Sequence, residues 1–392
     1  MVNTTHNRKR VIIAANTAWY LANFRLTLAQ SLQQAGYEVI LVAPHDDSVT
    51  RIRAAGLRFI PLPMDNAGTN PFRDALLTAR LVRLLRRERA DVFLGYTVKP
   101  NVYGGVACRL TRVPSVHNVA GLGTVFMRDN LLTRLVRGLY RLGMKRADMV
   151  FFQNSDDYEL FKRAGLVEAD RAKCLPGSGV DTSRFAPRHH GSPPRGQRPF
   201  RFVLSARLLW DKGIGEFVEA TRRLKDEGAN IECELLGFLG AENRTAIPRA
   251  RIEAWIEEGL IRYRGSVDDV RDVIAGADCV VLPSYYREGT PRSLLEAASM
   301  GKPIITTDSI GCRDTVEHQV TGYLCKPRDA LDLTRRMRDV LSLSEEQRYH
   351  MGQRGRMKMQ AEFEERIVID HYLSAVERII APKAESAATT HL

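Results

Sequence analysis

The 392-residue sequence has no long apolar run, few cysteines and none of the short glycine motifs that bind dinucleotides or triphosphates. Its apolar stretches are short, such as VIIAA from Val11 and CVVLP from Cys279, whereas a membrane-spanning helix needs about 18 apolar residues or more. The sequence therefore predicts a chain that does not span a membrane. Its start, MVNTTHNRKR, places charge before a predicted strand, so we do not expect a secretory signal there.

The six cysteines lie far apart and include no C-x-x-C pair. This spacing argues against a disulfide framework or a zinc site, and it favours reduced thiols in the cytoplasm. The segment VIIAANTAWYLANF has no glycine, so the G-x-G-x-x-G fingerprint is missing and an NAD site is disfavoured. No P-loop, G-x-x-x-x-G-K-[ST], occurs either, which argues against an ordinary NTPase.

Positive charge is unevenly distributed. The chain has 58 Lys and Arg residues against 46 Asp and Glu, a formal net charge of +12. Residues 1–190 hold 28 Lys and Arg against 15 Asp and Glu, so the first half carries the whole excess. This half is therefore expected to face a lipid surface, a nucleic acid or a phosphorylated acceptor.

Short apolar strands alternate with helical segments along the chain, which predicts an α/β protein with parallel sheets covered by helices on both faces. The pattern stops in a segment rich in Pro, Gly and Arg, residues 184–199, and then restarts, so this segment is the predicted linker. We expect two doubly wound, Rossmann-like domains facing a central cleft, at residues 1–185 and 186–365. A C-terminal helix, expected to pack back on the first domain, and a polar tail complete the chain at 366–392.

Two cations follow the first predicted strand of the second half. Arg207 and Lys212 lie in LSARLLWDKGIGEFVEA, in which Gly213 and Gly215 open a helix. Backbone N–H groups and the helix dipole favour phosphate at such a helix start. The pattern predicts an anion site, although a merely solvated basic loop would have the same residues.

A second stretch, LPSYYREGTPRSLLEAASMG, adds another helix start. Thr290 is predicted to cap a helix whose first residue is Pro291, because both residue types favour these positions. The backbone N–H groups of Arg292 and Ser293 would then point outward, where they can bind phosphate.

Two glutamates flank this helix start. Glu296 lies within the helix and suits the vicinal hydroxyls of a ribose, whereas Glu288 precedes the helix and can reach a second sugar beyond the phosphates. The alternative interpretation is that both are ordinary surface residues, because acidic side chains are common at helix starts.

Taken together, S-x-R-L-x-x-x-K-G and the two-glutamate motif resemble the retaining glycosyltransferases of family 4, which have the GT-B fold. The resemblance covers residues 10–380. It implies that Arg207 and Lys212 hold the donor diphosphate, that Glu296 binds the ribose and that Glu288 contacts the donor sugar.

The E-G-F-G core of this family reads E-G-T-P here, so Gly289 is kept but one backbone donor is lost at Pro291. Residues 263–269 resemble the family's strand and loop beside the nucleotide base. The resemblance therefore predicts three catalytic residues, Arg207, Lys212 and Glu288. The predicted donor-binding residues are Glu296, Gly289, Thr290, Arg292, Ser293 and Arg264.

The expected donor is a UDP-sugar, and no cofactor or metal is expected. Metal-dependent glycosyltransferases of the other major fold show a D-x-D motif, and no two aspartates of this chain are separated by one residue. The pairs Asp46/Asp47, Asp156/Asp157 and Asp268/Asp269 are more simply explained as turn or helix-start residues.

Three loops of the first half are expected to bind the acceptor, because ligands of open α/β sheets bind at the carboxyl ends of the strands. These loops are residues 16–25, 97–105 and 117–126. Glycines in the last loop allow the backbone to approach a ligand closely, and cations in the other two suit an anionic acceptor. The predicted acceptor-binding residues are Asn16, Arg25, Lys99, His117, Gly121 and Gly123.

The same loops resemble a subgroup that extends a sugar on undecaprenyl diphosphate in bacterial surface glycan assembly. The shared motifs are N-F-R at residues 23–25, K-P-N-x-Y-G at 99–104 and G-L-G at 121–123. His117 lies roughly where more distant family members have a sugar-contacting histidine; the alternative is a structural histidine at a strand end.

Two predicted helices carry the basic excess in stripes. Arg134, Arg137, Arg141 and Lys145 share one helix face, beside an apolar stripe. Arg73, Arg80, Arg83 and Arg87 align likewise on a second helix. Each such residue contributes about 1 kcal/mol near an anionic leaflet, which predicts peripheral docking on the inner face of the plasma membrane. Solvated basic faces are the alternative.

Two competing functions remain open. One keeps the fold but makes the protein an epimerase or hydrolase of a UDP-sugar. The other is a nucleic-acid-binding protein, which would bind DNA or RNA in a salt-sensitive manner. The sequence offers no platform of interleaved aromatic residues, and the phosphate motif of the second half would then have no role, so a nucleic-acid partner is not expected.

Overall fold

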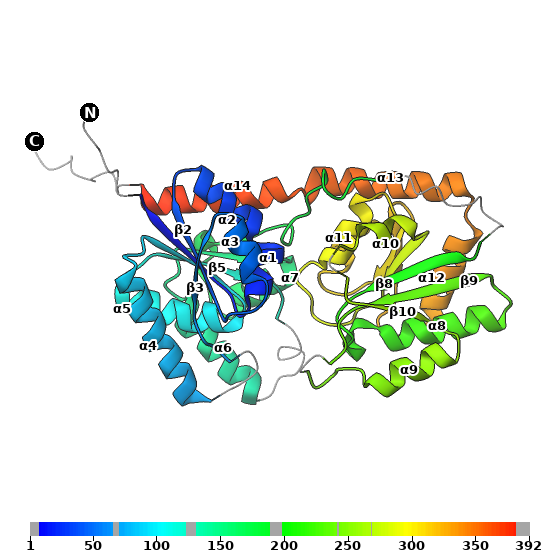
Figure 1. The fold of residues 1–392 in the computed structure, drawn as a ribbon, viewed down its shortest axis with the longest axis horizontal. Helices are drawn as coiled ribbons and strands as arrows, with labels where there is room; N and C mark the ends of the chain where they lie inside the picture. Colours follow the sequence, from blue (N-terminus) through cyan, green and yellow to red (C-terminus); the bar gives the residue numbers. More distant parts are fainter. Residues whose placement is uncertain are drawn as a thin grey trace, which may run out of the picture.

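The structure, a computed structural model, describes residues 8–65, 70–122, 131–188, 198–240, 243–267 and 269–381. It has two parallel sheets, each in its own domain, and the two domains lie side by side (Figure 1). The strand order is β3-β2-β1-β4-β5-β6-β7 in the first sheet and β10-β9-β8-β11-β12-β13 in the second. In both orders the chain reverses direction across the sheet at its first strand, as in doubly wound folds.

The first sheet is made of β1 (Arg10–Ala14), β2 (Glu38–Ala43), β3 (Arg58–Pro61), β4 (Val92–Tyr96), β5 (Ser115–Val119), β6 (Met149–Phe152) and β7 (Ala172–Cys174). Its helices are α1 (Ala18–Phe24), α2 (Leu26–Gln34), α3 (Val49–Ala54), α4 (Pro71–Arg87), α5 (Gly105–Thr111), α6 (Leu131–Met144), α7 (Ser155–Arg163) and the short η1 (Pro100–Gly104) and η3 (Ala169–Arg171).

The second sheet is made of β8 (Phe200–Ser205), β9 (Ile231–Leu236), β10 (Arg262–Gly265), β11 (Cys279–Leu282), β12 (Ile304–Thr307) and β13 (Gly322–Cys325). Its helices are α8 (Ile214–Asp226), α9 (Arg249–Glu257), α10 (Arg271–Gly276), α11 (Arg292–Ser299), α12 (Ala330–Ser342), α13 (Glu345–Glu362) and the short η4 (Trp210–Lys212) and η5 (Arg313–Thr315). The chain then continues into α14 (Glu365–Ile380).

The strands form because their apolar runs are buried on both faces, as parallel sheets require. The central strand β1 has four fully buried residues, and β4 and β5 are buried throughout. Helix α2 ends before Gly36, whose positive φ of 96° is the left-handed conformation that glycine adopts after a helix end. Apolar runs in the sequence mark every one of these strands except β7 and β13.

The last helix crosses back to the first domain. Helices α13 and α14 run along one side of both domains in Figure 1. Met351 and Met359 of α13 belong to the core of the second domain. Val368 and Tyr372 of α14 belong to the core of the first domain, beside residues of β1, β2 and β4. The polypeptide therefore passes between the domains twice.

The second crossing is tied to the first by backbone hydrogen bonds. Val180 N–H donates to Phe363 O at 2.8 Å, and Glu365 N–H donates to Val180 O at 3.0 Å. Phe185 already packs into the core of the second domain. The two crossings thus form one connection between the domains.

Candidate active site

Lys212 and Glu288 contact each other directly. They follow β8 and β11, which are parallel neighbours, so both loops leave the same edge of the sheet. Lys212 Nζ donates to Glu288 Oε1, and Ser284 Oγ donates to the same oxygen at 2.9 Å. Only 8% of Lys212 and 9% of Glu288 are exposed. Two residues predicted to bind the diphosphate and the sugar of the donor therefore form one buried ion pair.

Arg207 lies at the same edge. Its guanidinium is 5.7 Å from the centre of the Tyr286 ring, and Lys212 Nζ is 5.2 Å from that centre. Arg207 is exposed, so its charge faces solvent at the end of β8. The ring holds two cations near each other, and an incoming diphosphate would relieve their mutual repulsion.

The turn that carries Lys212 is packed tightly against the next loop. Gly213 has a φ of +75°, and a Cβ there would lie 2.1 Å from Pro283 O. The carbonyl of Asp211 accepts hydrogen bonds from the N–H groups of Tyr285 and Tyr286, both at 3.0 Å. Only glycine fits at position 213, which explains the K-G pair of the motif.

Thr290 does not cap helix α11, so that prediction is wrong. Helix α11 begins at Arg292, and Pro291 is its N-cap. The hydroxyl of Thr290 instead donates to Gln153 O of the first domain at 2.9 Å. Leu294 N–H donates to Pro291 O at 3.1 Å. The N–H groups of Arg292 and Ser293 precede this first helical bond, as anion binding requires.

Glu296 is held by Arg292 from the preceding helical turn. Arg292 Nε donates to Glu296 Oε1 at 2.9 Å, while its Nη1 donates to Asn23 O of the first domain at 2.9 Å. The guanidinium also lies 5.3 Å from the ring centre of Phe24. Burial raises the pKa of Glu296, and the charge of Arg292 opposes that rise. Arg292 thus joins the predicted ribose carboxylate to the first domain.

Two glycines lie where the backbones of the two domains approach each other closely. Gly121 has a φ of +98°, and a Cβ there would lie 2.5 Å from Gly289 N. A Cβ on Gly289 would lie 2.3 Å from Gln153 Oε1 and 2.9 Å from the carbonyl carbon of Ala120. The close approach predicted for Gly121 is therefore to the backbone of the second domain. Gly123 lies outside the described residues.

Arg25, which was predicted to bind the acceptor, is enclosed by aromatic rings. Only 2% of the residue is exposed, and its guanidinium lies 4.3 Å from the ring centre of Tyr96 and 5.6 Å from that of Tyr20. Its Nη2 donates to the Tyr20 hydroxyl at 3.1 Å. The ring of Tyr372 packs on Tyr96 with centroids 5.9 Å apart. Arg25 therefore belongs to an aromatic cluster that joins α14 to the first domain.

Lys99 and His117 also serve the interior of the first domain. Lys99 Nζ forms an ion pair with Asp74 Oδ1 at 2.7 Å, so its charge is already neutralised. His117 is fully buried, with Nδ1 3.3 Å from Asn101 Oδ1 and Nε2 3.1 Å from Ser115 Oγ. Burial lowers the pKa of His117 to about 4. Full burial of His117 favours the structural alternative, whereas the acceptor contact of Lys99 stays a prediction.

Two further predicted residues lie at strand ends. Asn16 follows β1, is half-buried, and its N–H donates to Thr97 Oγ1 at 3.2 Å. Arg264 lies on the edge strand β10 and its Nη2 donates to Glu234 Oε1 at 2.9 Å. Neither contact tests a ligand-binding role. Within the described ranges, no group of three or more His, Cys, Asp or Glu side chains is arranged to hold a metal ion.

Sequence reasoning missed the residues of the first domain that hold the Glu288 loop. Asp157 was interpreted as a helix-start residue, and it does lie in the first turn of α7, but its carboxylate also binds Arg287 at 2.7 Å. Asn154 Nδ2 donates to Glu288 O at 3.0 Å. Ser284 and Tyr286 lie within the motif LPSYYREGTPRSLLEAASMG. The serine four positions before Glu288 was the one sequence signal that this glutamate has a hydrogen-bond partner there.

Two family descriptions match the chain. Residues 186–358 match the one described as "Glycosyl transferases group 1", and residues 22–178 match a "Glycosyl transferase 4-like domain". A Campylobacter jejuni N,N'-diacetylbacillosaminyl-diphospho-undecaprenol alpha-1,3-N-acetylgalactosaminyltransferase is 26% identical over 91% of this chain and 96% of its own length. An Escherichia coli UDP-Gal:alpha-D-GlcNAc-diphosphoundecaprenol alpha-1,3-galactosyltransferase is 22% identical over 75% of this chain and 77% of its own length.

Solved structures share the fold. Anabaena HepE in complex with UDP and glucose has a TM-score of 0.76 at 16% identity, covering 95% of this chain and 100% of its own. Sucrose-phosphate synthase from Thermosynechococcus elongatus has a TM-score of 0.78 at 18% identity, with coverages of 95% and 100%.

These relatives are transferases, and nothing in them supports the epimerase or hydrolase alternative. The two glycosyltransferase descriptions match consecutive parts of the chain, one in each domain. The expected family and fold are confirmed: this chain belongs to the group 1, family 4-like glycosyltransferases and has the GT-B fold.

Proposed function

We propose that this enzyme transfers the sugar of a UDP-sugar to a hydroxyl of a lipid-diphosphate-linked saccharide, as a step in bacterial surface polysaccharide assembly. The observation that carries the proposal is the group of Arg207, Lys212 and Glu288 at one sheet edge, which offers two cations to a diphosphate and a carboxylate to a sugar. The named acceptors of the Campylobacter and Escherichia coli relatives support the lipid carrier, and UDP in the HepE complex supports the nucleotide.

In the proposed reaction, negative charge grows on the diphosphate as the glycosidic bond breaks. Arg207, Lys212 and the N–H groups at the start of α11 would stabilise that charge where it develops. No metal would then be required, a proposal that activity in excess chelator would test. Glu288 would position the donor sugar, and Glu296 would hold the ribose.

The resemblance to family 4 further supports retention of the anomeric configuration. The acceptor hydroxyl would attack on the face that the diphosphate leaves, and the departing diphosphate would take up the hydroxyl proton. In this scheme Glu288 forms no covalent bond with the sugar. The anomeric configuration of the product, read by NMR, would test this proposal.

We further propose that the first domain docks on the inner face of the bacterial plasma membrane, where a lipid-linked acceptor would be presented. Among the described residues, no helix is long and apolar enough to cross a bilayer. Exposed basic residues lie on or next to two helices of this domain: Arg83, Arg86 and Arg87 on α4, Arg134 and Arg141 on α6, and Lys145 just after α6. Attraction to anionic lipid grows with the number of such residues.

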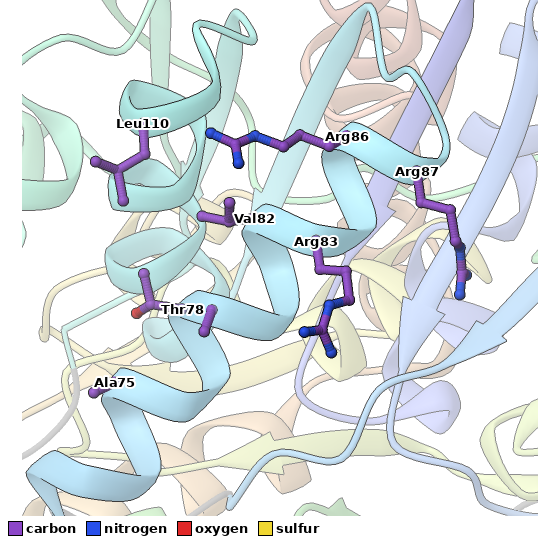
Figure 2. A pocket seen from close by; sticks show the side chains of 8 residues that line it. Ala75, Thr78, Val82, Arg83, Arg86, Arg87 and Leu110 are labelled. Atoms are coloured by element: carbon purple, nitrogen blue, oxygen red, sulfur yellow. The ribbon is translucent and has the colours of Figure 1, made fainter.

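Helix α4 also borders an open groove of about 820 Å³, shown in Figure 2. Ala75, Ala79, Val82 and Leu110 give this groove an apolar lining, and 60% of Leu110 is exposed. Figure 2 shows Arg86 extending toward Leu110, while Arg83 and Arg87 extend along the other side of the helix. Apolar side chains bordered by arginines suit the boundary between lipid headgroups and acyl chains.

A direct experiment tests the main proposal. The purified enzyme would be incubated with a panel of UDP-sugars and bacterial membrane extracts that contain lipid-linked monosaccharides, and the lipid products identified by mass spectrometry. We expect one UDP-sugar to add one residue to a lipid-diphosphate saccharide. Consumption of UDP-sugars at the same rate without membranes, or no lipid product with any donor, would contradict the proposal.

A further inference from the structure

The loop that carries Glu288 is held by the first domain. Its anchors are three residues that follow β6, which we call the socket: Gln153, Asn154 and Asp157. Gln153 O accepts from the Thr290 hydroxyl at 2.9 Å, and Asn154 Nδ2 donates to Glu288 O at 3.0 Å. The exposed fractions of the three socket residues are 6%, 2% and 0%. The donor-side loop therefore lies in a buried, polar site of the opposite domain.

The charged contact in the socket is the pair of Asp157 and Arg287. Both Nε and Nη2 of Arg287 lie 2.7 Å from Asp157 Oδ1. The other carboxylate oxygen, Oδ2, accepts from Asn154 Nδ2 at 3.1 Å. Asn154 also caps helix α7 by accepting from Asp157 N–H at 2.7 Å. Every oxygen of this fully buried carboxylate thus has a partner, which makes the geometry of the Arg287 contact specific.

Stability alone does not account for a buried ion pair at this place. The desolvation of two charges commonly cancels their attraction, so an apolar contact would hold the domains together at least as well. A charged pair adds a defined geometry. It also makes the contact between the domains strongly unfavourable when one partner is missing, because the other charge is then buried alone. Because its members belong to different domains, the pair exists only while the domains are together, and both charges regain water when they separate.

Arg287 is also the residue immediately before Glu288. Its side chain is fixed by Asp157, and the carbonyl of Glu288 is fixed by Asn154, so the first domain holds the chain on both sides of the Glu288 Cα. Glu288 itself then reaches back to Lys212 and Ser284 of the second domain. The carboxylate is thereby aligned by contacts from both domains.

We propose that Asp157 and Arg287 are positioning residues that align Glu288 only while the two domains are in contact, so that the acceptor domain completes the donor site. This inference rests on the role proposed for Glu288. It predicts that the donor can bind before the domains close, but that its sugar is positioned for transfer only afterwards.

The test compares Asp157→Asn, Arg287→Gln and the double variant, with UDP as the binding probe. Each single variant should lower kcat by about 10- to 100-fold, the range expected for a catalytic group displaced by about 1 Å. The dissociation constant for UDP should change by less than about threefold, because the predicted UDP contacts lie in the second domain. The double variant should be no worse than the poorer single one, because both changes break the same contact. Arg287→Lys keeps the charge but loses the contact through two nitrogens, so its kcat should lie between those of the wild type and Arg287→Gln.

The matched control breaks a comparable ion pair inside the second domain. Arg198 contacts Asp278 through two nitrogens at 2.6 and 2.7 Å. Arg198→Gln should lower the melting temperature without lowering kcat. Small-angle scattering in saturating UDP gives a second measurement, in which the Arg287→Gln variant should show a larger radius of gyration than the wild type and the control should not.

Three results would overturn the proposal: an unchanged kcat in both single variants, losses that multiply in the double variant, or a loss of UDP affinity as large as the loss of kcat. Failure of the proposed function looks different. In that case the wild-type enzyme makes no lipid-linked product, whereas UDP titration and scattering still report whether Asp157 and Arg287 hold the domains together.

Discussion

Lys212 and Glu288 form a direct ion pair, although one follows β8 and the other follows β11. A diphosphate that reaches Lys212 must compete with this carboxylate, and the same event frees Glu288 to accept hydrogen bonds from sugar hydroxyls. If the donor binds as proposed, binding of its phosphates and binding of its sugar would therefore be coupled through this contact. Substitution of either Lys212 or Glu288 should therefore affect the other residue as well.

Lys212→Ala should abolish turnover more than it weakens donor binding. The substitution removes a charge that acts on the leaving diphosphate, and it leaves Glu288 buried without its cation. We expect kcat to fall by about 100- to 1000-fold, with a much smaller change in the dissociation constant for UDP. Lys225→Ala, on α8 of the same domain, should keep the wild-type kcat. A Lys212→Ala enzyme with wild-type kcat would contradict the assignment.

Donor affinity should depend on the ionisation of Glu296. Burial raises the pKa of this carboxyl, so it takes up a proton at a higher pH than an ordinary glutamate and then no longer accepts from both ribose hydroxyls. UDP should therefore bind more weakly as the pH falls through that raised pKa. Glu296→Gln should bind UDP weakly at every pH.

The measurement is calorimetric titration of UDP at a series of pH values, with wild type and variant compared at each one. The protonation of UDP itself cancels in this comparison. Glu253→Gln, at an exposed ion pair of α9, is the control and should behave like wild type. Parallel pH profiles for wild type and Glu296→Gln would refute the prediction.

His117 should affect stability at acid pH and leave catalysis unchanged. Its folded pKa of about 4 lies below the ordinary value of 6.5, so the unfolded chain binds the proton first as the pH falls. The free energy of unfolding should therefore decrease below about pH 6.5, by about 3 kcal/mol near pH 4. His117→Asn should lose this part of the pH dependence.

Denaturant unfolding at several pH values checks this, with the exposed His350→Gln as the control. The KM of His117→Asn for the lipid acceptor should equal that of the wild type if the variant is folded. A raised KM together with an unchanged pH dependence of stability would restore His117 as a sugar-contacting residue.

Gly121→Ala should weaken the contact between the domains. The new Cβ would strain a φ of +98° and lie 2.5 Å from Gly289 N, so the two backbones must separate. We expect kcat to fall by about tenfold or more, with little change in UDP affinity. Gly138→Ala is a suitable control because nothing lies within 4 Å of a Cβ at that position. Equal kcat values for the two variants would contradict the interface described above.

Reversing the charge of Arg83, Arg86 and Arg87 together should reduce membrane binding. Each arginine contributes about 1 kcal/mol near an anionic leaflet, so the triple Glu variant should bind at least about 100-fold more weakly to phosphatidylglycerol vesicles. Cosedimentation measures this, and added salt should weaken wild-type binding in the same way. Binding to phosphatidylcholine vesicles should be weak for every variant. A matched control reverses three exposed arginines of the second domain, Arg249, Arg251 and Arg335.

The fold was largely predictable because buried parallel strands leave continuous apolar runs in the sequence. Two strands were not predicted, β7 and β13. Both are short edge strands, and the residues of β7 are largely exposed, so no apolar run marks it. The donor side was also accessible, since its residues lie in two continuous motifs that follow neighbouring strands.

The acceptor side was less predictable because the sequence shows charge but not the partner of each charge. Lys99 is neutralised by Asp74, and Arg25 is enclosed by tyrosines that are distant in the sequence. The socket had no motif at all: Asp157 and Arg287 are 130 positions apart. Contacts of this kind arise from the way the two domains pack, which periodicity within one domain does not encode.

The position of helix α14 has a consequence for biosynthesis. Tyr372 and Val376 fill the core of the first domain, beside Arg25 and the central strands. A ribosome-bound chain that has released only the first half therefore exposes an apolar surface that its own last helix will later cover. We infer that the amino-terminal domain matures after, rather than before, the carboxy-terminal one, and that nascent chains need protection from aggregation until then.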